Sequence, residues 1–429
     1  MTEETQKEEN IKFSKRPRGY MTFLVLTMSV ISLLDNMMAL MDTAVIDIPL
    51  VGMTDDFGIS SGDVRLWIAV YGLFAFLVFI IAWLNDALGR KKGLTILVLV
   101  IGVPAVLLPF TPSGPAGLHA SMLLYGLLTL GTIANTWEIP ITEEAPPKKR
   151  GILGAVAFLF GLLPIYALVG DDIAVALGSW KWSYAILGGI LMVAALCLLP
   201  FMKETKRWLL KKNEIQNKRF NLLHSVKTLS RKDWKYVMLL IITYTVWGIV
   251  FKFGGLATQK LFLDHGWTSD DYQTVLTISG ICLVFGALLA GIIMEKIGRH
   301  VTLIVGCVGS IASFILLGFT INPIFMVTLY FFMPVVLAYI TVYYPETFPT
   351  EIRATCVGIG VAVSRSSYVV GPLLSGVLIT ALNLTPATTE LWWIYWVVGG
   401  LLMILPMLSL LAKPYETKDQ ELEKILESR

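Results

Sequence analysis

A short charged stretch, Asn85-Asp86-Ala87-Leu88-Gly89-Arg90-Lys91-Lys92, connects two long apolar runs of the chain. A second stretch of the same kind, Glu295-Lys-Ile-Gly-Arg-His300, follows half a chain later and also lies between apolar runs. Both contain an acidic residue, two spacer residues and then Gly-Arg. Repetition of such a stretch at half-chain separation predicts two homologous halves, as in transporters built from a duplicated helical bundle.

The composition is that of a polytopic membrane protein. Of 429 residues, 55% are hydrophobic and only 15% are charged, against roughly 25% charged in soluble domains. The apolar residues form blocks of about 20, the length that crosses a bilayer core. Because backbone groups in lipid must be satisfied internally, these blocks are expected to be helices. The first block is too long for a cleaved signal segment, so we expect it to be retained as the first span.

The predicted fold class is an all-α membrane protein with twelve transmembrane helices in two pseudo-symmetric six-helix bundles. The first bundle is expected at residues 20–202 and the second at 236–412, joined by a basic connector at 203–235, with tails at 1–19 and 413–429. The twelve spans are predicted at Tyr20–Leu50, Val64–Leu84, Gly93–Phe110, Leu118–Ile141, Gly151–Leu177, Ser183–Met202, Tyr236–Leu263, Tyr272–Met294, Val301–Thr320, Pro323–Tyr344, Ala354–Leu382 and Leu391–Ala412.

The distribution of Lys and Arg predicts the orientation. Most of the 34 basic residues fall in the tails, the connector and every second loop, whereas the other loops collect aspartates. The positive-inside rule then places both termini in the cytoplasm of a multi-pass protein in the cell membrane. The basic connector fits either a lipid-headgroup patch or, more simply, an amphipathic surface linker.

Several function classes are not indicated. The four cysteines and four histidines show no metal, disulfide or catalytic-triad spacing, and no nucleotide-binding loop is present. We therefore expect no enzyme activity, no metal and no cofactor other than protons as a coupling ion. The expected partners are the lipid bilayer and a small-molecule substrate, without nucleic acid, for a protein that works as a monomer.

A second motif repeats in the two halves. Span four is followed by Glu143-Glu-Ala-Pro-Pro-Lys-Lys-Arg150 and span ten by Glu346-Thr-Phe-Pro-Thr-Glu-Ile-Arg353. In both, a proline comes three positions after the acidic residue and an arginine seven positions after it. An acidic residue at the end of a helix gains from a cation or from the N-terminus of another helix. We therefore expect Asp86 with Arg90, and Glu295 with Arg299, to bridge the bundles as a breakable cytoplasmic gate; the alternative is a static salt bridge. The residues assigned to this gate are Asp86, Gly89, Arg90, Glu143, Arg150, Glu295, Gly298, Arg299, Glu346 and Arg353.

Together these motifs make the chain resemble the major facilitator superfamily over essentially its whole length. Within the superfamily, it looks closest to the branch of sugar porters, aromatic-acid/proton symporters and organic cation/anion transporters. The segment Lys203-Glu-Thr-Lys-Arg-Trp-Leu209 is similar to the sugar porters' Pro-Glu-Ser-Pro-Arg-Trp-Leu. The resemblance implies a secondary transporter that works by alternating access. The chain departs from the family at Ala82, where a glycine is usual, and at Met122, near an arginine that the family often uses in proton coupling.

Three ionisable residues are predicted within a turn or two of the bilayer centre: Asp35 in span one, Lys252 in span seven and Arg365 in span eleven. Span one also carries Asp42. A charge at this depth costs about 2.5–3.5 kcal/mol or more and normally faces a protein interior. The two aspartates are seven positions apart and so lie on one helical face. We expect a charged central cavity in which Asp42 or Asp35 couples transport to protons, since burial raises a carboxyl pKa and a nearby cation lowers it.

Arg365 bears on the substrate. The run Ser364-Arg-Ser-Ser-Tyr-Val-Val-Gly-Pro372 resembles the span-eleven segment of organic-ion transporters, where this position tends to be acidic in cation carriers and arginine in anion carriers. The resemblance implies an organic anion held by the guanidinium; the alternative is a structural ion pair with Asp35 or Asp42. Met41-Asp-Thr43 also matches part of the Asp-Gly-Phe-Asp motif of aromatic-acid/proton symporters. The residues assigned to substrate binding are Arg365, Lys252, Asp42, Asn135, Trp247 and Tyr339.

The predicted function is therefore proton-coupled secondary transport of a small organic solute, in the first place an organic anion such as a carboxylate. Three alternatives stay open: a sugar or polyol porter, a multidrug efflux protein, and, from a different class, a nutrient sensor built on a transporter scaffold.

Overall fold

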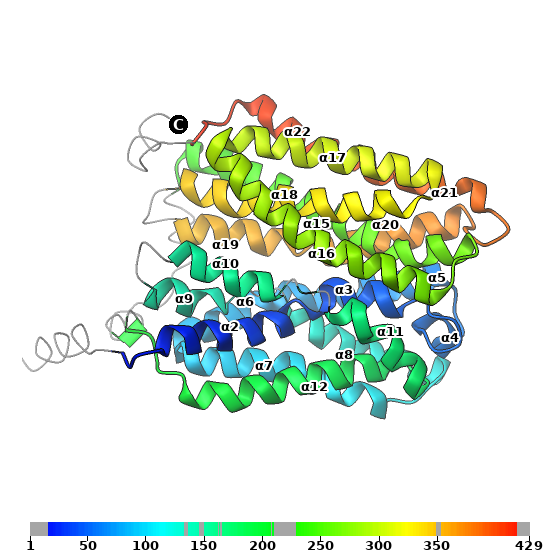
Figure 1. Ribbon diagram of the computed structural model, residues 1–429, viewed down its shortest axis with the longest axis horizontal. Coiled ribbons are helices and arrows are strands. Elements are labelled where there is room, and N and C mark those ends of the chain that lie inside the picture. Colours follow the sequence, from blue (N-terminus) through cyan, green and yellow to red (C-terminus); the bar gives the residue numbers. More distant parts are fainter. Residues whose placement is uncertain are drawn as a thin grey trace, which may run out of the picture.

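The computed structural model describes residues 16–132, 136–145, 150–161, 163, 165–206, 208–209, 229–348 and 353–417. Every regular element within these ranges is a helix, and the long helices run side by side along one axis (Figure 1). The all-α fold class predicted from composition is therefore confirmed. Most of the predicted connector 203–235 and of the tails 1–19 and 413–429 lies outside the described residues.

The two ends of the molecule along the helix axis are distinct. One end carries both ends of the described chain and the turns after α6 (Val78–Leu88) and α16 (Ser269–Lys296); we call it the terminal face (Figure 1). The other end carries the short helix α4 (Met53–Phe57) and the turn between α15 (Arg231–Asp264) and α16; we call it the opposite face.

Long uninterrupted helices form six of the predicted spans. In the described chain, eight helical stretches are long and apolar enough to cross a membrane. Helix α15 begins with a capping box of Ser230 and Asp233 and α16 begins with one of Thr268 and Asp271, which satisfy first-turn N–H groups. The uninterrupted helices are α7 (Arg90–Leu107), α12 (Lys181–Leu198), α15, α16, α17 (Arg299–Thr320) and α18 (Pro323–Thr347).

The other spans consist of shorter pieces, and the breaks fall near mid-span. Span one breaks at Asn36, whose side chain donates to the carbonyl of Ser32, a polar alternative to the helical ladder. Span eleven breaks at Arg365 and Ser366. The pieces are α2 (Tyr20–Asp35) and α3 (Met37–Val45); α5 (Ser61–Tyr71), η1 (Gly72–Leu77) and α6; α8 (Leu118–Gly131) and α9 (Glu138–Glu144); α10 (Arg150–Gly161) and α11 (Ile165–Leu177); α19 (Arg353–Ser364) and α20 (Ser367–Ala381); and α21 (Trp392–Leu402), α22 (Ile404–Leu408) and η7 (Ser409–Ala412). Short 3₁₀ turns lie at η2 (Leu108–Phe110), η3 (Pro115–Gly117), η5 (Leu199–Phe201) and η6 (Thr389–Leu391).

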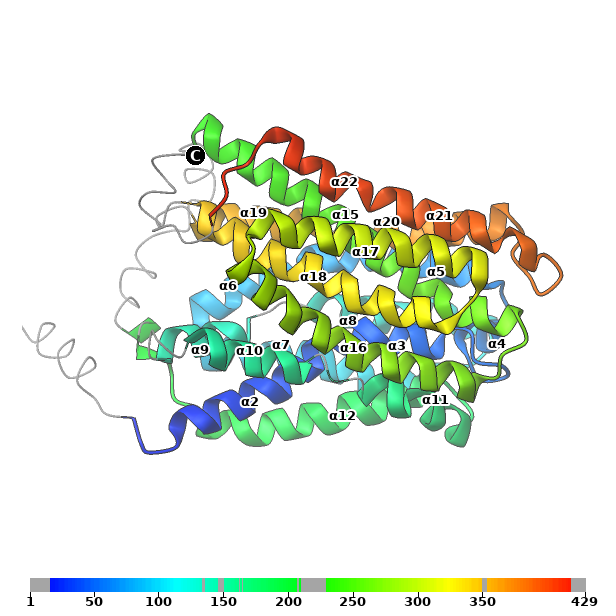
Figure 2. The same ribbon diagram turned by 45° about the horizontal axis from the view of Figure 1, so that its top comes forward.

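The two bundles contact each other mainly near the opposite face. Helix α5 packs on α20, α3 on α15 and α11 on α16 (Figures 1 and 2). Gly62 and Gly376 allow helices α5 and α20 to approach closely. A Cβ atom at Gly62 would clash with the Thr380 side chain, and one at Gly376 would meet the Gly62 carbonyl. The helices confined to the terminal half, α2, α6, α9, α10 and α19, make their principal contacts within their own bundle. The structure is therefore closed on the opposite face.

Candidate functional site

A buried carboxylate joins the two bundles at their centre. Asp42, on α3, accepts hydrogen bonds from the hydroxyls of Tyr125 on α8 (3.0 Å) and Tyr184 on α12 (2.7 Å). Its Oδ2 atom also lies 3.1 Å from Nζ of Lys252, which comes from α15 in the second bundle. The Asp42 side chain is only 2% exposed and that of Lys252 only 9%. The structure thus brings together Asp42 and Lys252, both assigned to substrate binding, in an ion pair that crosses from one bundle to the other; their role in binding stays a prediction.

Two cations share one aromatic ring beside this pair. Nζ of Lys252 lies 4.8 Å from the ring centroid of Tyr368, and Cζ of Arg365 lies 5.8 Å from it. The negative face of a ring attracts cations and partly replaces the water that burial removes. Arg365 is buried at the break between α19 and α20, so this break brings its guanidinium to the central cluster.

Asp35 extends the central cluster toward the terminal face. It is fully buried at the end of α2, next to the break at Asn36. It accepts a hydrogen bond of 3.1 Å from the indole N–H of Trp137, which precedes α9. Helix breaks thus position both Asp35 and Arg365.

The central cluster, defined as Asp35, Asp42, Lys252 and Arg365, is formally neutral when both acids are ionised. All four side chains are buried, and buried charges are tolerated when they balance and are hydrogen-bonded. Protonation of either carboxylate would leave the cluster with one net positive charge. The protonation state of these acids therefore sets the net charge of the cluster.

Two further residues assigned to substrate binding, Trp247 and Tyr339, make aromatic contacts within the second bundle. Trp247 stacks on Phe251, with ring centroids 5.3 Å apart, and its indole donates to the Met333 carbonyl (2.8 Å). Tyr339 is fully buried and stacks on Tyr343 at 4.8 Å, deep in the packing of the second bundle. In this structure Tyr339 packs within the bundle, and its role in substrate binding stays a prediction. Asn135 lies outside the described residues.

A polar network at the terminal face ties the helix ends of the first bundle together. Arg90, at the start of α7, pairs with Glu143 on α9 at 2.7 Å. Glu143 also accepts a 2.5 Å hydrogen bond from the Thr205 hydroxyl. Glu204 accepts from the backbone N–H groups of Arg90 (2.8 Å) and Lys91 (3.3 Å), so its charge caps the positive end of α7.

The second bundle repeats this network. Arg299, at the start of α17, pairs with Glu346 at 3.1 Å, and the Thr417 hydroxyl donates to Glu346 at 2.6 Å. Glu416 accepts from the backbone N–H groups of Arg299 and His300, both at 3.0 Å. Our reading of the sequence missed this role of Glu416, although Glu204-Thr-Lys and Glu416-Thr-Lys are a third repeat in the chain.

The predicted bridge between the bundles is a breakable one, and it stays a prediction for the state in which the terminal face is closed. The described ion pairs of Arg90 and Arg299 stay within their own bundles. Each arginine begins the third helix of its bundle, and the nearest acid ends the fourth helix of the same bundle. Glu295 is exposed. The side chains of Asp86, Arg150 and Arg353 lie outside those that the structure describes.

Replacing Gly89 with alanine is expected to destabilise the protein by about 1–3 kcal/mol. The φ of Gly89 is 102°, which is unfavourable for an L-residue with a side chain. In addition, the new Cβ atom would lie 2.5 Å from Oε2 of Glu204. The matched control is Gly266→Ala, where φ is also positive (81°) but nothing lies within 4 Å of the added Cβ. Thermal unfolding in detergent compares the two variants. Equal losses of stability would mean that the Glu204 contact contributes nothing.

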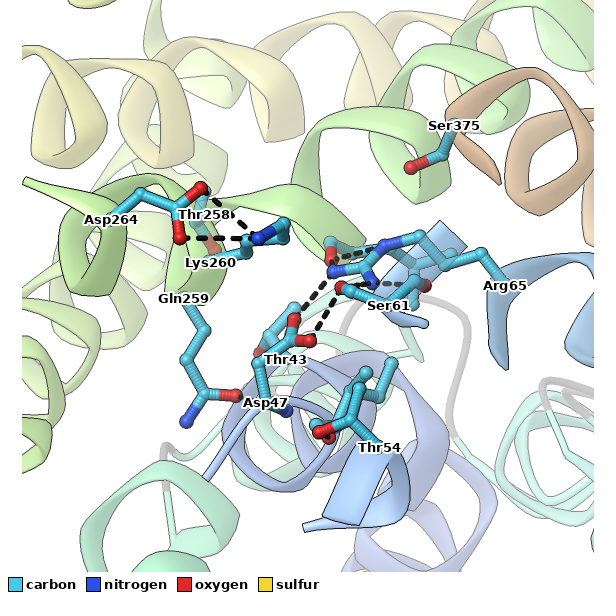
Figure 3. A network of polar contacts seen from close by, with 12 residues as sticks. Thr43, Asp47, Thr54, Ser61, Arg65, Thr258, Gln259, Lys260, Asp264 and Ser375 are labelled. Carbon is cyan, nitrogen blue, oxygen red and sulfur yellow. Dashed lines mark hydrogen bonds and ion pairs between the residues drawn. The ribbon is translucent and has the colours of Figure 1, made fainter. Parts of the chain in front are cut away.

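A second polar network closes the opposite face (Figure 3). Arg65, on α5, is fully buried and pairs with Asp47 at 2.6 Å. Its guanidinium also donates to the Leu256 carbonyl of α15, with Nε at 3.0 Å. Gln259, one turn further along α15, donates to the Ala44 carbonyl (3.2 Å) and accepts from the Asp47 N–H (3.0 Å). This network was not predicted from the sequence. Its signal was Arg65, one of few basic residues on the side of the membrane where the loops collect aspartates.

Two helical bundles that share a buried charged centre and are closed at one face form the architecture of a secondary transporter. The chain belongs to the Major Facilitator Superfamily, whose family model matches residues 25–262 and 252–427. This is a family of transporters and not of enzymes.

Individual relatives are distant but cover most of the chain. The glucose transporter GlcP of Staphylococcus epidermidis is 23% identical over 80% of this chain and 83% of its own length. The arabinose-proton symporter of Bacillus subtilis is 23% identical over 98% of both chains. A putative niacin/nicotinamide transporter, NiaP, of Bacillus subtilis is 26% identical over 70% of this chain and 75% of its own. Among solved structures, the partially occluded inward-open xylose transporter XylE from E. coli matches with a TM-score of 0.68 at 17% identity, over 94% of this chain and 100% of that one. This structural likeness confirms the two-bundle fold.

Proposed function

We propose that the protein is a proton-coupled transporter of a small, uncharged, polyhydroxylated solute, that is, a sugar or polyol. The observation that carries this proposal is the Asp42–Lys252 ion pair. Because Lys252 already has a counter-charge, the central cluster has no net positive charge to offer an anion. This replaces our first expectation of an organic anion, and the glucose and arabinose transporters among the relatives favour the same solute class.

A small organic anion is the second candidate, because two buried cations, Lys252 and Arg365, flank one ring. If a proton neutralised Asp42 or Asp35, the cluster would gain a net positive charge and would suit a carboxylate. The name of the relative NiaP, a putative niacin/nicotinamide transporter, is compatible with this candidate. The two candidates differ in the charge of the solute that travels with the proton.

Alternating access supplies the mechanism that we propose. The terminal-face networks fasten the helices of each bundle to one another, so each bundle moves as a unit. Opening the opposite face separates α3 and α5 from α15 and α20, which breaks the Asp42–Lys252 pair. Protonation of Asp42 removes the charge that holds Lys252, and this lowers the cost of that separation. The proton and the conformational change are thereby linked.

We place the terminal face in the cytoplasm, because Arg90, Lys91, Lys92 and Arg299 all lie there and basic residues favour the inner side. One chain contains both bundles and all four charges of the central cluster, so we propose that it works as a monomer in the cell membrane.

Counterflow of labelled solutes in proteoliposomes tests the proposal. Preloading with an unlabelled hexose, pentose or polyol is expected to drive uptake of the labelled form, whereas preloaded monocarboxylates give none. Exchange of carboxylates alone would replace the proposed function with the second candidate. No exchange of any solute, combined with ligand-induced thermal stabilisation, would indicate a sensor on a transporter scaffold. Exchange of large apolar cations would indicate multidrug efflux.

A further inference from the structure

The opposite face is fastened along one side of α15. Lys252, Leu256 and Gln259 stand at positions i, i+4 and i+7 and therefore share a helical face. All three are buried. Each contributes one polar group to the first bundle: the Lys252 ammonium, the Leu256 carbonyl and the Gln259 amide. This polar stripe runs from the central cluster outward to the opposite face.

Partners of this polar stripe lie at and just beyond the C-terminal end of α3. The last carbonyls of a helix lack intrahelical partners and need other donors. Gln259 donates to the carbonyl of Ala44, and the Tyr272 hydroxyl of α16 donates to the carbonyl of Thr43 at 3.0 Å. Helices of the second bundle thus satisfy backbone groups that α3 cannot satisfy itself. When the bundles separate on this face, those groups pass to water.

Arg65 can separate from the second bundle without becoming an isolated charge. Its counter-ion, Asp47, and a further acceptor, Ser61, belong to its own bundle. Within the described residues, its hydrogen bonds to the second bundle go to the neutral carbonyl of Leu256. Separation therefore breaks hydrogen bonds that contribute about 0.5–1.5 kcal/mol each in neutral cases and somewhat more with a charged donor, while the buried ion pair survives. The Asp42–Lys252 pair differs, because separation takes its two charges apart.

We propose that the hydrogen bonds of Arg65 and Gln259 between the two bundles hold the opposite face closed; we call these two residues the lock. We also propose that α15 couples the lock to the central cluster, because the same face of this helix carries Lys252. Both are positioning residues that act through α15 and need not touch the solute. The inference rests on the alternating-access function proposed above but is independent of which solute is carried. It assigns the gate to one arginine that keeps its own counter-ion and one glutamine that caps α3.

Spin-label distance measurements on the full chain test the lock without any solute. The labels go on Ala176 of α11 and Ala381 of α20, exposed alanines near the opposite face in different bundles. The four native cysteines are first replaced. Arg65→Ala and Gln259→Ala are each expected to shift the distance distribution to longer values, and Arg65→Lys, which keeps the charge but loses the two-pronged donor, to shift it less.

The matched control is Lys181→Ala. Lys181 is a buried cation on the same face that pairs with Asp56 at 3.1 Å, but both residues belong to the first bundle. Its loss is expected to leave the distances unchanged. The lock is refuted if Gln259→Ala keeps the distribution of the unmodified protein, or if Lys181→Ala shifts the distances as far as Arg65→Ala does. Because no solute is added, a wrong solute class would leave these results unaffected.

Discussion

Asp42→Asn is expected to abolish proton-driven accumulation of the solute while preserving counterflow. Asparagine resembles the protonated carboxyl in shape. The Tyr125 and Tyr184 hydroxyls donate to different oxygens of the present carboxylate, at 3.0 and 2.7 Å. The amide oxygen of asparagine can accept from one of these hydroxyls, and its NH2 group can donate to the oxygen of the other. It cannot release a proton, so the cluster keeps one charge state through the whole cycle. Uptake driven by an imposed pH gradient measures the first property, and equilibrium exchange measures the second.

Asp35→Asn is the matched comparison, because the sequence left the choice between the two aspartates open. Asp35 lies within the first bundle beside the indole of Trp137, whereas Asp42 faces Lys252 across the bundle boundary. The Asp42–Lys252 contact breaks when the opposite face opens, whereas the Asp35–Trp137 hydrogen bond lies within the first bundle and stays intact. We therefore expect Asp35→Asn to retain accumulation. The assignment to Asp42 fails if Asp35→Asn loses accumulation and Asp42→Asn retains it.

The fold was predictable because its signals are local in the sequence. Apolar blocks of membrane-spanning length predict helices, and the repeats at Gly89-Arg90 and Gly298-Arg299 predict two halves. The depth of Asp35, Lys252 and Arg365 along their spans also follows from simple residue counting. These features need no knowledge of which helix packs on which.

The pairings were not predictable, because they depend on tertiary contacts. Asp42 was expected near a cation, but its ion pair with Lys252 depends on the packing of α3 against α15. The pairing of Arg90 with Glu143 was missed, since the sequence does not show that the two residues lie side by side in the same bundle. The break that brings Arg365 to the centre carries only a weak signal, the polar run Ser364-Arg-Ser-Ser367. Leu256 is missed altogether because it acts through its carbonyl, which every residue has.

Removing the positive member of the central pair is expected to cause one of the largest losses of stability that a single substitution can cause in this protein. Lys252→Met leaves Asp42 buried without its cation, and breaking a buried pair in this way costs about 3–5 kcal/mol. Combining it with Asp42→Asn removes the uncompensated charge, so the double variant should lose less than the sum of the two single variants. Lys260→Met provides a control, because that lysine pairs with Asp264 along the same helix and not across the bundles. Thermal and denaturant unfolding in detergent measure the stability of the three single variants and the double variant relative to the unmodified protein. Strictly additive losses, or a Lys260→Met variant as unstable as Lys252→Met, would show that the Asp42–Lys252 pair does not hold the two bundles together.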